Sequence, residues 1–217
     1  MLPQSLFESS NSKTISLYSR EGRKLLRLSR YQRNYQLLER KLKFEKQVWI
    51  SYCGVASTAI VLNAMIDSDL YVQFNPFESD KKQIISPIEV LSGMKLKQLG
   101  QLLEEHEMNV RVFFARSTNI EQFRDLAKEY LNKSDCFVIV NYFRKLLDQF
   151  GWGHISPLGA YNSEADSFLI LDVAQNRSPV WVKTDILYRA MIANDGLFNE
   201  SRGFVLVTRN TNNYIRK

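Results

Sequence analysis

Residues 47–54 read Q-V-W-I-S-Y-C-G and lead into the most apolar helix that the sequence predicts, residues 53–66. This helix has almost no polar face, so we expect it to lie at the centre of the fold. Cys53 would occupy its first turn, where the positive end of the helix dipole lowers the pKa of a thiol. Gly54 would let substrate and backbone approach the sulfur closely. The segment therefore predicts both a central helix and a reactive sulfur.

Two further stretches, G-W-G-H at 151–154 and L-I-L-D at 169–172, place a histidine and an aspartate at the ends of predicted strands. Glycines leave space in front of the imidazole of His154. Asp172 ends an apolar run, where a carboxylate is costly unless it has a partner. Cysteine, histidine and aspartate are the parts of a thiol nucleophile, its base and the group that orients the base. Gln47 could donate to an oxyanion, so the pattern favours acyl transfer through a thioester.

The spacing of the histidine and the aspartate indicates that they are neighbours. The predicted strands 154–161 and 167–173 are joined by the turn 162–166, which gives a hairpin whose opposed residue numbers sum to near 328. The sum for His154 and Asp172 is 154 + 172 = 326. We therefore expect the two side chains to meet at the open end of this hairpin.

The chain is 45% hydrophobic and 24% charged, which is typical of a globular protein. Its length of 217 residues predicts one domain over residues 1–217. No apolar run approaches the ~18 residues that a membrane-spanning helix needs, and no secretory signal is visible, which leaves the compartment open. Cys136 lies in an apolar run and is expected to be a buried, inert thiol. Two histidines and two cysteines far apart match no standard zinc spacing, so we expect no metal site.

The positive charge of the chain is concentrated in residues 20–46, which hold ten Lys and Arg against three Glu. The same segment has apolar residues at a spacing of three to four, which is typical of a basic amphipathic helical segment packed on a core. Residues 1–19 before it are expected to form an extended arm. Such a basic stripe can also bind nucleic acid or an anionic membrane, and this alternative stays open here.

The remaining periodicities predict an α+β fold. We expect helices near 96–103, 120–131 and 184–193, and strands at 110–115, 136–142 and 203–209. Residues 67–94 are expected to form loops and short helices. Because the helices come mainly first and the strands second, the sequence favours helices that pack against a largely antiparallel sheet.

Seven stretches together resemble the phytochelatin synthase family, and the similarity covers residues 2–208. They are 47–63, 92–94, 99–103, 151–162, 171–174, 179–182 and 201–204. The resemblance implies a papain-like cysteine peptidase fold, with a helical lobe that carries Cys53 and a sheet lobe that carries His154 and Asp172. It makes these three residues a catalytic triad and places Gln47 at the oxyanion site.

The resemblance also implies the substrate, which in this family is glutathione (γ-Glu-Cys-Gly). The thiolate attacks the Cys–Gly bond, glycine leaves, and a γ-Glu-Cys thioester remains on the enzyme. Asp195 and Arg202 match the family positions that hold the γ-Glu end, and Gly153 and Ile155 are assigned to substrate binding with them. The chain looks like the short bacterial members of the family and would serve metal detoxification. No bound cofactor is implied, because ions such as cadmium act there as part of a thiolate substrate, and relatives suggest a homodimer.

One departure from the family pattern affects the expected reaction. Gln175 stands where the family usually has an arginine that is linked to the second, acceptor glutathione, although Arg177 lies nearby. We therefore expect water to resolve the acyl-enzyme in most turnovers and phytochelatin synthesis to be weak. The alternatives are a general papain-like peptidase and a basic module that binds nucleic acid or membrane and retains a relic thiol site. The leading hypothesis needs neither nucleic acid nor a transmembrane segment.

Overall fold

The structure, a computed structural model, describes residues 12–73, 85–195 and 200–210, apart from the side chains of Phe44 and Asp195. Within these residues the helices are α1 (Arg20–Leu28), α2 (Arg33–Phe44), α3 (Cys53–Ile66), α4 (Leu96–Glu105), α5 (Ile120–Leu131), α6 (Thr184–Ile192) and the short 3₁₀ helices η2 (Ala115–Ser117) and η3 (Arg144–Leu147). The strands are β1 (Thr14–Ser16), β2 (Met108–Phe114), β3 (Cys136–Phe143), β4 (Gly153–Asn162), β5 (Ser167–Ile170), β6 (Val180–Lys183), β7 (Asn194–Asp195), β8 (Glu200–Ser201) and β9 (Gly203–Arg209).

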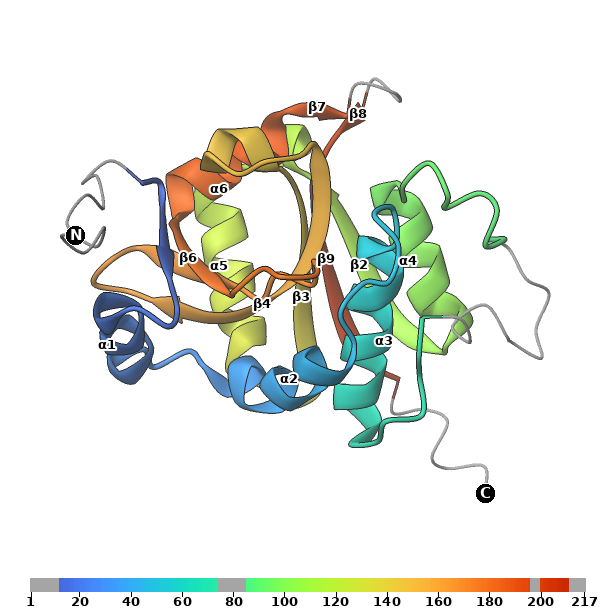
Figure 1. Cartoon of the computed structure of the whole chain (residues 1–217), viewed down its shortest axis with the longest axis horizontal. Helices are drawn as coiled ribbons and strands as arrows, with labels where there is room; N and C mark the ends of the chain where they lie inside the picture. The colour runs from blue at the N-terminus through green and yellow to red at the C-terminus, as the bar shows by residue number, and fades with distance from the viewer. Residues whose placement is uncertain (1–11, 74–84, 196–199, 211–217) are drawn as a thin grey trace, which may run out of the picture.

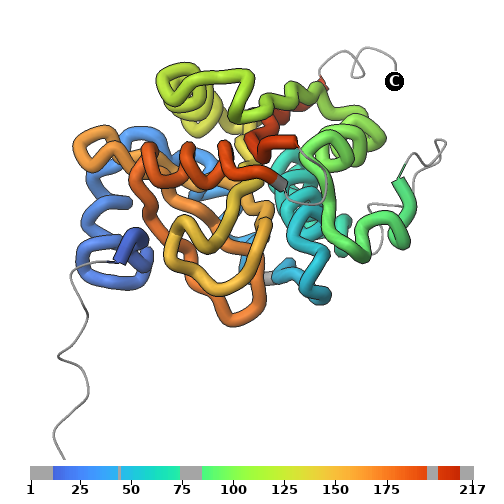
Figure 2. The backbone as a smooth tube through the Cα atoms, turned by 90° about the horizontal axis from the view of Figure 1, so that it is seen from above, coloured from blue at the N-terminus to red at the C-terminus, as the bar shows by residue number. Residues whose placement is uncertain are grey.

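The predicted α+β class is confirmed. The described strands form a seven-stranded antiparallel sheet in the order β1-β6-β5-β4-β3-β9-β2, and β7 and β8 pair separately. The sheet is strongly curved, with α1 at one end of the molecule and α4 at the other (Figures 1 and 2). The strand order places β4 in the middle of the sheet, with β5 and β3 on either side of it.

Helices cover both faces of the sheet, and strand β3 shows how the sequence arranges this. Phe137 and Ile139 pack with α2, α3 and α4 in one hydrophobic cluster, whereas Val138 and Val140 pack with α5 and α6 in the other. Alternate residues of a strand point to opposite faces, so a strand buried on both faces needs a continuous apolar run. The run at 136–142 meets that requirement. The sheet is therefore a central layer between two groups of helices.

The apolar helix α3 lies in the first of these clusters, as its sequence predicts. All of its residues except Ile66 are buried, and Ile60 and Val61 have no exposed surface. Burying each large aliphatic side chain contributes roughly 1.5–3 kcal/mol. The Ser57 hydroxyl donates to the carbonyl of Ile155 over 3.2 Å, which ties α3 to strand β4. The N-terminus of α3 is thus fixed beside the start of β4.

The basic segment 20–46 forms two helices, and several of its polar groups are structural. The buried Lys41 ammonium donates to the carbonyl of Ser68 and to the carboxylate of Asp69, each over 2.7 Å. The side-chain amide of Asn34 donates to three main-chain carbonyls at the end of α5 and the start of β3. Helix α2 therefore packs on the core, as the apolar spacing predicts, while α1 keeps its cations exposed.

Two details differ from the sequence expectations. The segment 1–19 is not simply an extended arm, because β1 adds to the sheet edge against β6; residues 1–11 lie outside the described part of the chain. The second strand of the hairpin ends at Ile170 instead of residue 173, because the main-chain N–H of Ala174 donates to the Asp172 carboxylate and turns the chain. Residues 74–84 of the expected loop region also lie outside the described residues. No helix in the described segments has the length and apolarity required to span a bilayer.

Candidate functional site

The Cys53 sulfur lies where α3, β4 and the segment before α4 converge. Cys53 is the first residue of α3, and its side chain is buried and free of any disulfide. A Cβ atom added at Gly54 would lie 2.7 Å from the Met94 sulfur and 3.2 Å from the Ile155 side chain, so only glycine allows this approach. Ile155 thus packs against the first turn of α3. This contact brings the residue before it, His154, to the sulfur.

His154 and Asp172 are in direct contact, which confirms the proximity predicted from their spacing. Nε2 of His154 is 2.9 Å from Oδ1 of Asp172, and both side chains are buried. The register of the hairpin sums to 329 near its turn, at Tyr161 and Phe168, and to 328 beyond a bulge, at Leu158 and Ile170. Because Nε2 faces the carboxylate, Nδ1 is the nitrogen left for the sulfur. The imidazole lies within hydrogen-bonding reach of the Cys53 thiol.

The electrostatics of the three groups favour a thiolate–imidazolium pair. Burial raises the pKa of Cys53, but the hydrogen bond and charge of His154, together with the backbone N–H groups of Ile155 and Gly54, outweigh it and leave the thiol pKa below its ordinary value. Burial lowers the pKa of His154, and the contacts with Asp172 and Cys53 reverse this to a net rise. The pKa of Asp172 is lowered despite its burial, mainly by His154 and then by Arg144.

The side chain of Gln47 is buried and braces the turn before α3. Its Nε2 donates to the carbonyls of Trp49 and Ile50, each over 3.1 Å, and its main-chain N–H donates to the carbonyl of Val173 over 2.8 Å. Both amide hydrogens are therefore used within the protein. An oxyanion role requires one of these bonds to be exchanged for the substrate oxygen, so that role stays a prediction.

Gly153 and Arg202 lie side by side next to His154. A Cβ atom at Gly153 would be 3.1 Å from Nη2 of Arg202, so the glycine leaves room for the guanidinium. Arg202 is buried, with its Nη1 donating to the carbonyls of Ala193 and Asn194, and its guanidinium stacks over the Phe143 ring. Arg202 is thus held against Gly153, the residue that precedes the predicted base His154.

The other residue predicted to bind the γ-Glu end, Asp195, ends strand β7. Its main chain pairs with Glu200 of β8. Its side chain lies outside the described part of the structure, so its role stays a prediction. Elsewhere, the prediction that Cys136 is an inert core thiol fits its environment, because burial, and then Asp135, raise its pKa to about 12.

The structure brings two cations to Asp172 that sequence reasoning missed. Nη2 of Arg144 is 2.8 Å from Oδ1 of Asp172, in a pair that is almost fully buried. Nζ of Lys46 donates to the carbonyl of Asp172 over 2.5 Å and to that of Arg177 over 3.1 Å. A usable signal exists for Arg144, because it directly follows an apolar strand, as Asp172 does.

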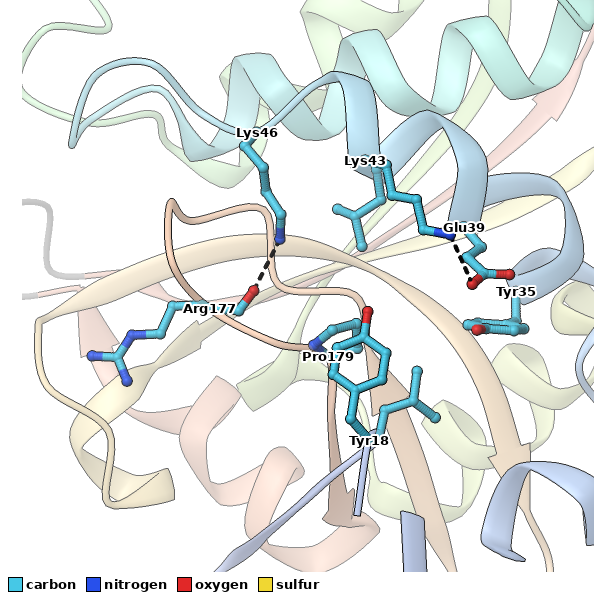
Figure 3. A pocket seen from close by; sticks show the side chains of 9 residues that line it. Tyr18, Tyr35, Glu39, Lys43, Lys46, Arg177 and Pro179 are labelled. Atoms are coloured by element: carbon cyan, nitrogen blue, oxygen red, sulfur yellow. Dashed lines mark hydrogen bonds and ion pairs between the residues drawn. The ribbon is translucent and has the colours of Figure 1, made fainter. Parts of the chain in front are cut away.

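Figure 3 shows how Lys46 reaches across a small cavity from the segment after α2 to the loop after β5. The cavity measures about 70 Å³ and is lined by Tyr18, Tyr35 and Pro179 among others. Lys46 thereby fixes the main chain on both sides of the turn that presents the Asp172 carboxylate. Burial lowers the pKa of this ammonium, and the charge of Asp172 opposes that effect.

Within residues 12–73, 85–195 and 200–210, no three side chains of His, Cys, Asp or Glu gather into a group that could hold a metal ion. A buried thiol beside an imidazole whose second nitrogen faces a carboxylate is the arrangement of thiol enzymes that form acyl intermediates. The fold and the site together define a candidate thiol acyl-transfer centre in an α+β protein.

Comparison with known proteins agrees with a thiol acyl-transfer centre and identifies the protein family. The family model described as phytochelatin synthase matches residues 8–204, and the chain belongs to this family. It is 33% identical over 172 residues to glutathione gamma-glutamylcysteinyltransferase 1 of Arabidopsis thaliana, an alignment that covers 76% of this chain and 36% of the relative.

Two further relatives carry the same activity in their names. The chain is 34% identical over 172 residues to glutathione gamma-glutamylcysteinyltransferase 1 of Triticum aestivum, which covers 76% of this chain and 34% of the relative. It is 24% identical over 164 residues to glutathione gamma-glutamylcysteinyltransferase of Schizosaccharomyces pombe, which covers 72% of this chain and 39% of the relative. The chain thus spans about a third of the length of the plant relatives.

Proposed function

We propose that this protein is a glutathione-cleaving thiol enzyme with a papain-like catalytic fold. Cys53 is the nucleophile, His154 the acid and base, and Asp172 the group that orients the histidine. The observation that carries the proposal is the buried 2.9 Å contact of His154 with the Asp172 carboxylate, in a strand that packs against the first turn of the helix that begins with Cys53. Membership of the phytochelatin synthase family supports glutathione as the substrate.

The first half of the reaction forms the acyl-enzyme. The Cys53 thiolate attacks the carbonyl carbon of the Cys–Gly bond, and the carbonyl oxygen becomes an oxyanion. The main-chain N–H of Cys53, in the first turn of α3, has no partner within the helix and is suited to bind this oxygen together with Gln47. His154 then gives its proton to the departing amine, so that glycine leaves and a γ-Glu-Cys thioester remains on Cys53.

The second half regenerates the thiol. A water molecule gives its proton to His154 and attacks the thioester, which yields γ-Glu-Cys and restores the thiolate–imidazolium pair. If the amine of a second glutathione attacks instead, the product is (γ-Glu-Cys)₂-Gly. Gln175 is exposed in the loop after Asp172 and supplies no charge for an anionic acceptor, and the cation of this loop, Arg177, lies two residues further on. We therefore propose that water is the main acceptor.

Substrate orientation is assigned to the residues beside His154. Arg202 would bind the α-carboxylate of the γ-Glu end, since a guanidinium binds a carboxylate through two parallel hydrogen bonds. Its position next to Gly153 supports this assignment. Asp195 would bind the α-amine. We also propose that the protein forms a homodimer and that cadmium enters the reaction as part of a thiolate substrate.

The test is to incubate the purified protein with glutathione, with and without cadmium, and to identify the products by mass spectrometry. We expect glycine and γ-Glu-Cys in equal amounts, little (γ-Glu-Cys)₂-Gly, and no product from Cys53→Ala. The matched control is Cys136→Ala, which removes the other thiol and should retain the wild-type rate. Equal product from Cys53→Ala and wild type, or no glycine from wild type, would contradict the proposal.

A further inference from the structure

The buried cation Arg144 has no part in the reaction steps above, yet the protein holds it in one position. Its Nη2 contacts Oδ1 of Asp172 over 2.8 Å, and its Nη1 donates to Oε1 of Gln149 over 2.7 Å. Its main-chain N–H donates to the carbonyl of Trp152. Gly151 has a φ of +114°, and a Cβ atom there would lie 3.1 Å from Cδ of Arg144. The turn after η3 is therefore built around this side chain.

Arg144 and His154 share a single oxygen of Asp172. Oδ1 accepts from Nη2 of Arg144 over 2.8 Å, from Nε2 of His154 over 2.9 Å and from the N–H of Ala174 over 2.9 Å. The arginine thus acts on the histidine through the carboxylate. A carboxylate fixed by two other donors cannot rotate away from the imidazole, so its orientation is set before substrate binds.

The positive charge of Arg144 balances the charges of the catalytic groups. Four groups are linked side chain to side chain: in the reactive state Cys53 and Asp172 carry −1 each, and His154 and Arg144 carry +1 each, so their net charge is 0, with Lys46 and Arg202 outside this set. Without Arg144 the sum is −1. Excess negative charge in a buried site opposes the thiolate and retains the imidazolium proton. His154 must lose that proton to the departing glycine.

Other polar groups face the cluster from the elements packed on it. The ring of Tyr142 of β3 lies nearly perpendicular to the imidazole, and burial raises the pKa of its phenol well above the ordinary value, so it stays neutral. Lys46 donates to the main-chain carbonyl of Asp172, and burial lowers the pKa of its ammonium while the charge of the Asp172 carboxylate raises it. Arg202 lies beside Gly153. Among the described residues, Arg144 is the arginine that pairs with the catalytic carboxylate.

We propose that Arg144 is a positioning residue, which holds the Asp172 carboxylate against His154 and balances the charge of the buried cluster so that His154 can both keep the thiolate and release its proton. This inference rests on the proposed function for its catalytic meaning. Its geometric part concerns Cys53 reactivity alone and can be tested without glutathione.

The first test compares Arg144→Gln with the wild type. The rate of Cys53 alkylation by iodoacetamide is measured against pH through the mass of the Cys53 peptide, with Cys136 as an unreactive internal reference. We expect the acid limb of the profile to move to higher pH by about one unit, because the loss of a nearby positive charge raises the pKa of the thiol. A limb at the wild-type pH with only a lower plateau would overturn the proposal.

The matched control is Arg124→Gln, which removes an arginine from a carboxylate pair remote from the sulfur, Arg124–Asp166. Its alkylation profile should coincide with that of the wild type. A shift in this variant equal to that of Arg144→Gln would show a general effect of lost ion pairs and would also overturn the proposal.

A second variant, Arg144→Lys, covers the case in which Arg144→Gln does not fold. Lysine keeps the positive charge but cannot reach both Asp172 and Gln149 as the guanidinium does, so the acid limb should stay within a few tenths of a pH unit of the wild type.

The second measurement is glycine release by Arg144→Lys, for which we expect kcat to fall about tenfold with KM unchanged. A raised KM with an unchanged kcat would show instead that Arg144 contacts the substrate. If the wild type released no glycine, the proposed function would fail while the alkylation profiles still tested the role of Arg144.

Discussion

Strand β5 has an aspartate–arginine pair beyond each of its ends, and the two pairs differ in what surrounds them. Before the strand, Asp166 binds Arg124 through two parallel hydrogen bonds of 2.9 and 3.0 Å and also accepts from the hydroxyls of Tyr161 and Thr184. After the strand, Asp172 binds Arg144 through one hydrogen bond and shares that oxygen with His154. The same chemistry is thus used in two ways.

Exposure explains the difference. The Asp166 side chain is 43% exposed, so its pair with Arg124 can fasten the hairpin turn to α5 but has little influence on distant charges. The Asp172 side chain is 1% exposed, and its charge acts at short range on an imidazole in a dry site. An ion pair at the surface is an anchor, whereas a buried pair that includes a third titratable group controls protonation.

The largest expected effect comes from removing each aspartate in turn. Asp172→Ala should lower kcat/KM for glycine release at least a hundredfold, because His154 loses its orienting partner. It should also cost about 3–5 kcal/mol of unfolding free energy, because it leaves Arg144 charged and buried without its partner. Asp166→Ala should cost about 1–2 kcal/mol and keep kcat/KM within about twofold. Urea unfolding and steady-state kinetics on both variants measure this contrast. Equal losses of activity in the two variants would contradict it.

A smaller effect separates stability from catalysis at the buried pair. The double variant Arg144→Met, Asp172→Leu replaces both charges with apolar groups, so we expect it to recover about 2 kcal/mol or more relative to Asp172→Ala. Activity should remain lost. Urea unfolding with glycine release on the same sample tests this, and recovered activity without the carboxylate would refute the role of Asp172.

The smallest effect is on pH dependence at the exposed pair. Despite partial burial, the hydrogen bonds from Arg124, Thr184 and Tyr161 lower the pKa of Asp166 from 3.8 to about 2. A carboxylate with a lowered folded-state pKa contributes stability above its unfolded pKa and loses it as pH falls. The stability difference between wild type and Asp166→Asn should therefore be full above about pH 4 and should fade toward pH 2. A difference that does not change between pH 5 and pH 2 would show that Asp166 has no such role.

The sequence predicted those parts of the fold that depend on strong local patterns. The apolar run 53–66 marks α3, and the continuous run 136–142 marks a strand buried on both faces. The spacing about the 162–166 turn was sufficient to place His154 against Asp172, even though a bulge between Leu158 and Ala160 changes the register by one.

Other parts depend on contacts that no local pattern encodes. Strand β1 has three residues, too few for a periodic pattern to stand out, and its partner β6 lies more than 160 positions later. Arg144 is one of 29 Lys and Arg residues, and only the folded chain shows which of them is buried against a carboxylate. The position of Gln47 before Cys53 predicted an oxyanion donor. Only the folded structure shows that its side-chain amide already donates to two main-chain carbonyls.

The most direct measurement of the central claim is the mass of the protein during turnover with glutathione. Acid quenching in the first turnover, followed by peptide mapping, should reveal a γ-Glu-Cys acyl group on Cys53, formed in the same amount as released glycine and missing from His154→Ala. An acyl group on Cys136, or glycine released with no modified Cys53 at any time, would contradict the thiolate mechanism.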